Sequence, residues 1–323
     1  MTYQIQYKKY RRRFREPLQT GAQRITYREG IILKLRDAEG ELGFGEVAPI
    51  RGFSLETLAD AENWLQQLGE KWEGNPVPEQ LPCCGFAISG ALRWLSGGFD
   101  IGETIALETA SLLPAGAGAL DESSRKLREG FRTFKWKVGV KNLHTEQEIA
   151  CELANSGNLR LDANGSFSKD ELKQWCQFIS ENENIEFIEQ PLPPGHWQAA
   201  QAIAEQMNQA NKVALDEEVT TVSQIAKIQN AGFKGKLVMK SALAGWISEI
   251  PDQNLIHSSA LETAIGKETA LRLALESQNC LGFGVGELFE DDGLDLHDTG
   301  PLIQVGQVGI QVMEEIWERI GNY

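Results

Sequence analysis

The stretch Thr133-Phe134-Lys135-Trp136-Lys137-Val138-Gly139 combines strand-forming residues with two lysines. Aromatic and β-branched residues dominate it, which predicts a β-strand. Side chains two residues apart on a strand share a face, so Lys135 and Lys137 point the same way. Two like charges side by side are ordinary in solvent but unfavourable inside a packed core. The strands that follow decide which environment this face meets.

Charged residues end each of the next strand-like runs, at intervals of 25, 27, 27 and 24 residues: Lys137, Asp162, Glu189, Asp216 and Lys240. Helical patterns lie between them, and alternating strands and helices predict a parallel sheet. The repetition favours a TIM-type barrel. A doubly wound open sheet is the alternative, but it usually carries G-x-G-x-x-G after its first strand, and that motif is absent here.

The strands predicted for this region cover 105–107, 133–138, 159–162, 185–189, 213–216, 236–240 and 255–259. The predicted helices cover 145–153, 169–179, 197–207, 222–229 and 268–276. Before this region, residues 1 to about 50 read as strands joined by turns. Ser54 is the predicted N-cap of an amphipathic helix, and a second helix is expected over 82–96. The first section is therefore an α+β module.

Composition narrows the class of protein. The chain has 323 residues and a formal net charge of −15. This charge argues against a non-specific nucleic-acid binder and against docking on an anionic membrane, but it leaves a small anionic ligand open. No apolar run reaches transmembrane length. The basic cluster within residues 8–15 favours an edge strand blunted by charge over a transit peptide.

The cysteines indicate the compartment. There are five, an odd number, and none forms a C-x-x-C pair. A disulfide framework and a zinc site are therefore not expected, and the reducing cytoplasm fits best. The sequence predicts no particular oligomeric state.

The carboxylates at the strand ends predict a metal site. Alone, Asp162, Glu189 and Asp216 each have an ordinary structural explanation as turn, strand-end or cap residues. Together they would converge at the barrel mouth, where active sites lie, and would repel one another. A divalent cation relieves that repulsion, and an all-oxygen set favours Mg²⁺ over zinc.

This combination resembles the enolase superfamily, specifically its muconate-lactonizing-like branch. Lys135-x-Lys137 is similar to the K-x-K of the second barrel strand, and Lys240 to the lysine of the sixth. The remaining matches are the three metal ligands, at Asp162, Glu189 and Asp216. The resemblance covers nearly the whole chain. It implies a modified (β/α)₇β barrel with an α+β capping domain.

The same resemblance divides the chain into three parts. Residues 1–100 are expected to form the capping domain, 101–292 the barrel, and 293–323 a C-terminal segment that packs back on the cap. Gly43-x-Gly45-Glu46-x-x-Pro49 is similar to the G-x-G-E-x-x-P motif of that cap.

Within the branch, three motifs are most similar to the o-succinylbenzoate synthase family. They are Arg160-Leu161-Asp162-Ala163-Asn164, Ser258-Ser259-x-x-Glu262-x-x-x-Gly266 and Pro49-x-x-Gly52-Phe53-Ser54. One departure is Ser241, which follows Lys240 where the family often has proline. The segment 286–292 is not diagnostic.

That resemblance implies an enzyme, a Mg-dependent lyase of menaquinone or phylloquinone biosynthesis, with Mn²⁺ as an alternative metal. The implied substrate is a small anionic dicarboxylate. Lys137 is expected to remove a proton and then protonate the departing hydroxyl. Lys240 is expected to stabilise an enediolate from the opposite face, and Lys135 to bind the substrate carboxylate and lower the pKa of Lys137. The implied substrate-binding residues also include Asn164, Ser258 and Ser259, with the loops at Thr20–Gly21 and Gly52–Ser54 as candidates for the succinyl arm.

Two other functions remain open at this point. A dipeptide epimerase or an N-acylamino acid racemase, such as an N-succinylamino acid racemase, also uses lysines on both faces of its substrate. The Ser258-Ser259 pair favours the synthase, because such racemases more often carry glycine and methionine there. A non-catalytic binding protein on the same barrel would explain the fold but not the intact set of lysines and carboxylates.

Overall fold

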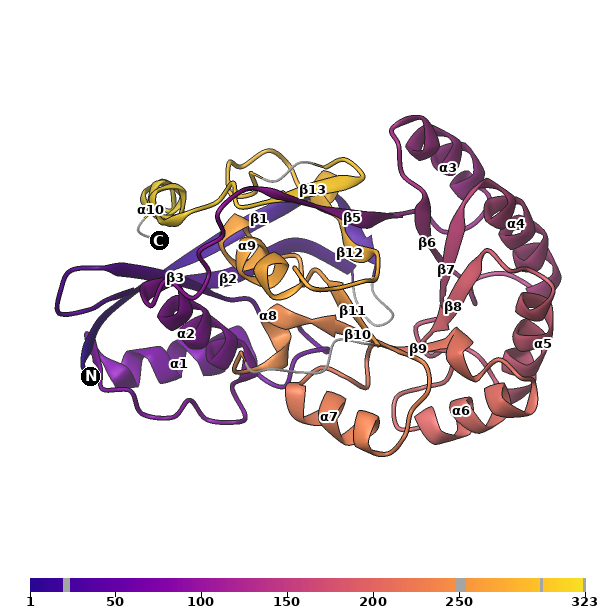
Figure 1. Cartoon of the computed structure of the whole chain (residues 1–323), viewed down its shortest axis with the longest axis horizontal. Helices are drawn as coiled ribbons and strands as arrows, with labels where there is room; N and C mark the ends of the chain where they lie inside the picture. The colour runs from indigo at the N-terminus through magenta and orange to yellow at the C-terminus, as the bar shows by residue number, and fades with distance from the viewer. Residues whose placement is uncertain (20–23, 248–253, 297–298, 322–323) are drawn as a thin grey trace.

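The computed structural model describes residues 1–19, 24–247, 254–296 and 299–321. It contains a parallel barrel beside an antiparallel sheet, with α3 to α7 forming an arc around the side of the barrel away from the cap (Figure 1). The barrel strands pair in chain order from β5 to β12, and pairing of β12 with β5 closes the ring. The predicted TIM-type barrel is thus confirmed, and the open-sheet alternative is wrong.

The barrel alternates strands and helices as predicted. Its strands are β5 (Ile105–Leu112), β6 (Thr133–Lys137), β7 (Asn158–Asp162), β8 (Ile185–Glu189), β9 (Val213–Leu215), β10 (Lys236–Lys240), β11 (Leu255–Ser258) and β12 (Leu281–Gly284). Its helices are α3 (Gly118–Arg128), α4 (Leu143–Ser156), α5 (Lys169–Ser180), α6 (Trp197–Gln206), α7 (Val222–Asn230), α8 (Ser241–Ala244) and α9 (Ala264–Leu273), with short 3₁₀ turns η1 (Ala210–Lys212) and η2 (Gly286–Leu288).

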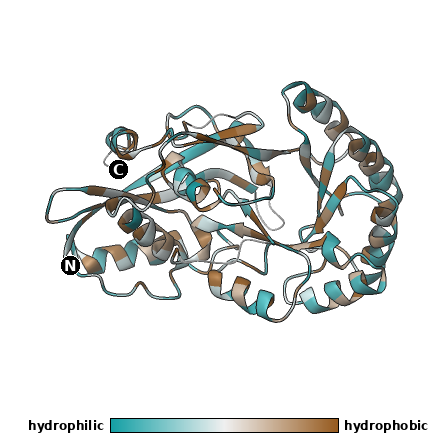
Figure 2. Cartoon of the chain, in the orientation of Figure 1, coloured by the Kyte–Doolittle hydropathy of each residue, from teal (hydrophilic) through white to brown (hydrophobic). Residues whose placement is uncertain are grey.

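Two apolar layers stabilise the barrel. Between strands and helices, Trp136 is fully buried in the largest hydrophobic cluster, so it points away from the barrel axis as predicted. A separate small cluster consists of Phe187, Ala214, Val238 and Ile256, one from each of β8 to β11. The helices of the arc carry both hydrophobic and hydrophilic residues, as helices with one buried face do (Figure 2).

The cap is a four-stranded antiparallel sheet covered by two helices. Its elements are β1 (Tyr3–Gln19), β2 (Arg24–Arg36), β3 (Leu42–Val47), α1 (Leu58–Leu68), β4 (Lys71–Trp72) and α2 (Pro82–Leu95). Helix α2 lies directly against β3. A Cβ atom at Gly43 or Gly45 would come within 2.0 Å of the carbonyl oxygen of Ala91 or Ala87. The two glycines of the G-x-G-E motif therefore permit this close packing.

The C-terminal segment connects barrel and cap. Strand β13 (Leu302–Val305) pairs antiparallel with β5, a contact the sequence did not predict. Helix α10 (Ile310–Arg319) places Trp317 against Phe44 of the cap, and Lys8 Nζ donates to the Trp317 carbonyl at 2.9 Å. The three-part division of the chain at residues 100 and 292 stays a prediction.

The basic N-terminal cluster lies on β1, as its strand assignment requires. Several of its charges are paired with the segment that follows β12. Arg12 Nε lies 2.8 Å from Asp292 Oδ2, and Arg13 Nε lies 3.4 Å from Glu290 Oε1. The cluster therefore joins the first strand to the end of the barrel. Within the described parts of the chain, every helix is too short or too polar to span a bilayer.

Two predicted helix starts are wrong. Helix α1 begins at Leu58 because Thr57 and Asp60 form a capping box, whereas the Ser54 hydroxyl accepts from the Ile50 amide at 2.8 Å. The helix predicted over 268–276 is α9, which begins at Ala264 and ends at Leu273. Its first turn is capped by Thr263 and by a carboxylate from the cap, a partner that local sequence does not reveal.

Candidate active site

Strand register brings the predicted residues together at the carboxyl ends of the barrel strands. Lys137 lies opposite Asp162 between β6 and β7, and Asp162 lies opposite Glu189 between β7 and β8. Asp216 directly follows β9, and Lys240 ends β10. Parallel strands end at the same rim, so these charges form one polar mouth.

Lys135 is held between two of the carboxylates. Its Nζ lies 2.9 Å from Asp162 Oδ2 and 2.6 Å from Glu189 Oε1. Burial disfavours the charge, but Asp162 and Glu189 outweigh burial and hold the pKa of Lys135 well above its usual range. Across the mouth, Lys240 Nζ forms an ion pair with Asp216. The lysine face of β6 therefore points inward, into a polar mouth and not into the packed core.

Lys137 differs from its neighbour. It is half-buried, and neither a hydrogen bond nor an ion pair joins it to any residue the structure describes. It shares a face with Lys135, whose ammonium is already bound by carboxylates. The two lysines of the K-x-K thus have different environments, since among the described residues Lys135 has carboxylate partners and Lys137 has none.

The carboxylates fit a divalent cation by their chemistry. Glu189 is 2% exposed, and burial together with the charges of Asp162 and Asp216 raises its pKa even though Lys135 opposes the shift. Hard oxygen donors with excess negative charge are the ligands that Mg²⁺ prefers. Within the described ranges, no three acidic, histidine or cysteine side chains lie close enough together to coordinate one metal ion as they stand. The Lys135 ammonium lies between two of these carboxylates instead.

Two residues that the sequence did not single out support the mouth. Gln190 adopts a positive φ of 38° after β8, and its side-chain oxygen accepts from the Asp216 amide at 3.1 Å. Glu217 accepts from Asn164 Nδ2 at 3.3 Å, and its other oxygen is buried without a partner among the described residues. Burial and the charge of Asp216 raise the pKa of Glu217. In the sequence, the acidic run Asp216-Glu217-Glu218 is the feature that could have indicated a role for Glu217.

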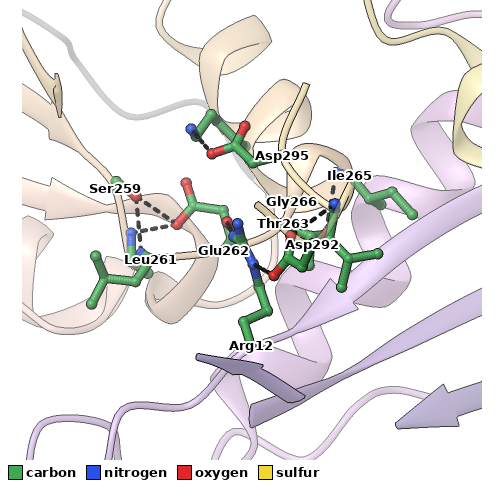
Figure 3. Close-up of polar contacts among 12 residues, drawn as sticks. Arg12, Ser259, Leu261, Glu262, Thr263, Ile265, Gly266, Asp292 and Asp295 are labelled. Atoms are coloured by element: carbon green, nitrogen blue, oxygen red, sulfur yellow. Dashed lines mark hydrogen bonds and ion pairs between the residues drawn. The ribbon is translucent and has the colours of Figure 1, made fainter. Parts of the chain in front are cut away.

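The predicted substrate serines follow one another at the end of β11, where both hydroxyls already have protein partners. The Ser258 hydroxyl donates to the Gly282 carbonyl at 3.1 Å. The Ser259 hydroxyl donates to Glu262 at 3.0 Å and accepts from the Leu261 amide at 2.9 Å (Figure 3). Ser259 therefore shapes the turn after β11. Substrate contacts by either serine stay a prediction, as does the role of Asn164.

A carboxylate from the cap binds the helix that follows this turn. Glu46 is fully buried and accepts from the amides of Thr263 and Gly266, each at 2.9 Å. The Tyr10 hydroxyl donates to it at 2.5 Å. A carboxylate at a helix N-terminus satisfies amides that have no partner within the helix and favours the helix dipole. The Glu46 of the G-x-G-E motif thus fixes the cap to α9.

The loop after β3 reaches the mouth. Buried Arg28 donates to the Pro49 carbonyl at 2.6 Å and to the Ala260 carbonyl at 3.0 Å, joining this loop to the turn after β11. The Lys240 ammonium lies 4.3 Å from the centre of the Phe53 ring. The candidate loop Gly52–Ser54 is thus next to the charged residues, whereas Thr20–Gly21 lies outside the described residues.

Comparison with known proteins places the chain in a family. Residues 4–95 match a family model described as the MenC N-terminal domain, and residues 119–252 match one described as enolase C-terminal domain-like. An o-succinylbenzoate synthase of Thermosynechococcus vestitus is 33% identical over 98% of this chain and 98% of its own length. The chain belongs to the o-succinylbenzoate synthase family. The resemblance of its motifs to this family and to the enolase superfamily is confirmed.

Solved structures agree with the fold. The o-succinylbenzoate synthase of Thermosynechococcus elongatus BP-1, solved with Mg in its active site, superposes with a TM-score of 0.84 at 31% identity, covering 98% of this chain and 99% of its own. The L-Ala-D/L-Glu epimerase of Bacillus subtilis has a TM-score of 0.75 at 18% identity, covering 93% and 95%. The second likeness shows the shared fold alone. The predicted barrel with an α+β cap is confirmed, and the o-succinylbenzoate synthase family is one of enzymes.

Proposed function

We propose that the chain catalyses the dehydration of 2-succinyl-6-hydroxy-2,4-cyclohexadiene-1-carboxylate to o-succinylbenzoate and water, in menaquinone or phylloquinone biosynthesis. The observation that carries this proposal is the 33% identity to an o-succinylbenzoate synthase over 98% of both chains. The lysines and carboxylates of the mouth also support it, because they lie at the carboxyl ends of the strands, where barrel enzymes have their active sites.

In this proposal Asp162, Glu189 and Asp216 hold Mg²⁺, or Mn²⁺ in its place. A bound divalent cation would offset the negative charge that develops on the substrate carboxylate when its α-proton leaves. The all-oxygen donor set and the Mg in the related synthase structure support the assignment.

Lys137 is the proposed base and acid. Its side chain is not tied to any described residue, so its amine is available to take the α-proton and give the enediolate. The same nitrogen would then protonate the departing hydroxyl, so that the proton leaves with the water.

The other two lysines have electrostatic roles in the proposal. Lys240, on a strand across the barrel, would stabilise the enediolate, and Lys135 would hold the substrate carboxylate. Both are held by carboxylates of the mouth, which places their ammonium groups next to the proposed metal ligands. Three carboxylates, one Mg²⁺ and the ammonium groups of Lys135 and Lys240 sum to about +1 when Lys137 is the neutral base, which suits a small anionic substrate.

The cytoplasm is the proposed location. All five cysteines are free thiols, as a reducing compartment keeps them.

A dehydration assay tests the function. Formation of o-succinylbenzoate should be lost with EDTA and return when Mg²⁺ is added back. A matched sample receives Ca²⁺ in place of Mg²⁺. This control tests whether any divalent cation restores turnover, since the larger coordination sphere of Ca²⁺ positions a substrate differently. Turnover that is unaffected by exhaustive chelation would contradict the proposed metal role.

Two further assays address the other candidate functions. An N-succinyl amino acid incubated in D₂O reports α-proton exchange; exchange with inversion, and no dehydration of the cyclohexadiene substrate, would identify a racemase. Titration of Mg²⁺ into wild type and Asp162→Asn by calorimetry addresses a non-catalytic binding protein. Metal binding that Asp162→Asn weakens supports the enzyme, and indifference of both proteins to metal opposes it.

A further inference from the structure

The opposite end of the barrel contains a second charged cavity. It has a volume of about 310 Å³ and lies at the amino ends of the strands. Its polar lining includes Arg160, Glu186, Lys212, Lys236 and Asn279. Phe187 and Ile256 of the small apolar cluster also line it, so this cluster forms its inner wall. We call this cavity the lower mouth.

Most of the positive charge in the lower mouth has no carboxylate partner. Arg160 is 3% exposed and pairs with Glu186, with 2.6 Å between Nε and Oε2. Lys212 Nζ donates to the carbonyls of Ile185 at 2.6 Å and Glu183 at 3.5 Å, and Lys236 Nζ donates to Asn279 Oδ1 at 3.0 Å. All three acceptors are neutral. Within the described ranges neither lysine forms an ion pair, although the chain as a whole carries a net charge of −15.

A hydrogen bond to a neutral oxygen satisfies one N–H of an ammonium and leaves its charge uncompensated. Each lysine has three N–H donors, so at least one donor remains for a ligand at each position. A cavity with an apolar wall and an excess of one sign of charge concentrates the field and raises the local concentration of counter-ions. An oxyanion would accept hydrogen bonds in which donor and acceptor are both charged, which are stronger than the bonds to neutral oxygens that the lysines now make.

We propose that the lower mouth is a binding site for a small oxyanion of the phosphate or carboxylate class, held by Lys212 and Lys236 beside the Arg160–Glu186 pair. This site is separate from the polar mouth at the carboxyl ends of the strands, which we call the upper mouth. Lys236 and Lys240 begin and end the same strand, about 13 Å apart along it, and Val238 of the apolar cluster lies between them. The proposal therefore does not depend on the proposed function.

Calorimetric titration of the Mg-loaded enzyme tests the site, with inorganic phosphate as one probe and succinate as the other. Lys236→Gln should weaken binding of the preferred probe about tenfold or more, because it removes a charge-assisted hydrogen bond. Lys236→Arg should retain binding. The exposed neighbour Lys234, which pairs with Glu205, provides the matched control Lys234→Gln, which should leave affinity unchanged. The probe that binds more tightly identifies the source of the oxyanion.

Turnover of Lys236→Gln should stay within about twofold of wild type, which verifies that the barrel is folded. Lys240→Gln separates the two mouths, since binding at the lower mouth should survive it. If neither probe binds at millimolar concentration, or if binding is lost in Lys240→Gln and kept in Lys236→Gln, the lower mouth is not an anion site.

Discussion

The two mouths of the barrel are built from the same strands. Strand β7 contributes Arg160 to the lower mouth and Asp162 to the upper one, and β10 contributes Lys236 and Lys240 in the same way. The small cluster that contains Val238 lies between them. Because inward positions recur every second residue, β10 presents Lys236, Val238 and Lys240 in turn, whereas on β7 Arg160 and Asp162 occupy successive inward positions.

The mouths differ in how their charges are neutralised. In the upper mouth each held lysine contacts a carboxylate, as with Lys135 and Asp162. In the lower mouth Lys212 and Lys236 contact neutral oxygens. When a metal cation and an anionic substrate bind together, a lysine–carboxylate pair can separate. The carboxylate then pairs with the cation and the lysine with the substrate. The comparison shows that the two ends of the barrel differ in the partners of their lysines, since carboxylates hold Lys135 and Lys240 whereas neutral oxygens hold Lys212 and Lys236.

The largest difference in kcat/KM is expected between variants of two glutamates of β8. Glu189→Gln should lower kcat/KM about 10⁴-fold, because metal stabilisation of the developing charge is worth several kcal/mol. Glu186→Gln, at the lower end of the same strand, should change it less than about threefold. Steady-state dehydration assays in excess Mg²⁺ provide the measurement. Equal losses in both variants would show that the mouths are not independent.

The second prediction concerns Lys137, which pairs with no residue that the structure describes. Lys137→Ala should reduce kcat by about 10²- to 10⁴-fold, the usual range for loss of a general base or acid. Mg²⁺ affinity should not weaken, because Lys137 pairs with none of the described carboxylates. Exposed Lys141→Ala is the control. Near-normal turnover of Lys137→Ala would rule out its proposed role.

The apolar layer between the mouths is the third target. Ile256 is 3% exposed, so Ile256→Ala should lower the free energy of unfolding by about 2–5 kcal/mol. Urea denaturation measures this as a lower midpoint at unchanged slope. Ile105→Ala, at a residue 37% exposed on β5, should have a much smaller effect. Similar losses at both sites would indicate that the layer is not tightly packed.

The smallest expected effect concerns Glu262, which supports the turn beside the upper mouth. Burial and the charge of Glu46 raise the pKa of Glu262. The folded state therefore holds this proton more tightly than the unfolded state, so the group lowers stability as pH rises above about 4.3. Glu262→Gln removes this dependence. The stability of the variant relative to wild type should increase with pH, measured by thermal unfolding across acidic to neutral buffers, whereas exposed Glu41→Gln should show no such trend.

Much of the upper mouth could be predicted because its signals are local. The two-residue spacing of Lys135 and Lys137 fixes their common face, and the regular interval between charged strand ends reveals the repeating unit. The buried outward position of Trp136 follows from the same alternation. Periodicity along one strand needs no knowledge of any other strand.

Contacts between distant segments were decided only by the tertiary structure. The start of α9 depends on Glu46, more than 200 residues earlier in the chain, and the cap loop is held by Arg28 through the Ala260 carbonyl. The polar residues Arg160, Glu186, Lys212 and Lys236 of the lower mouth recur at intervals of 26, 26 and 24 residues, but only the structure shows that they line one cavity. The sequence by itself determined the repeating strands, the charged residues that end them and the family they resemble. Which hydrogen-bond donors and acceptors meet was determined by packing, because buried polar groups must find partners wherever the fold brings them together.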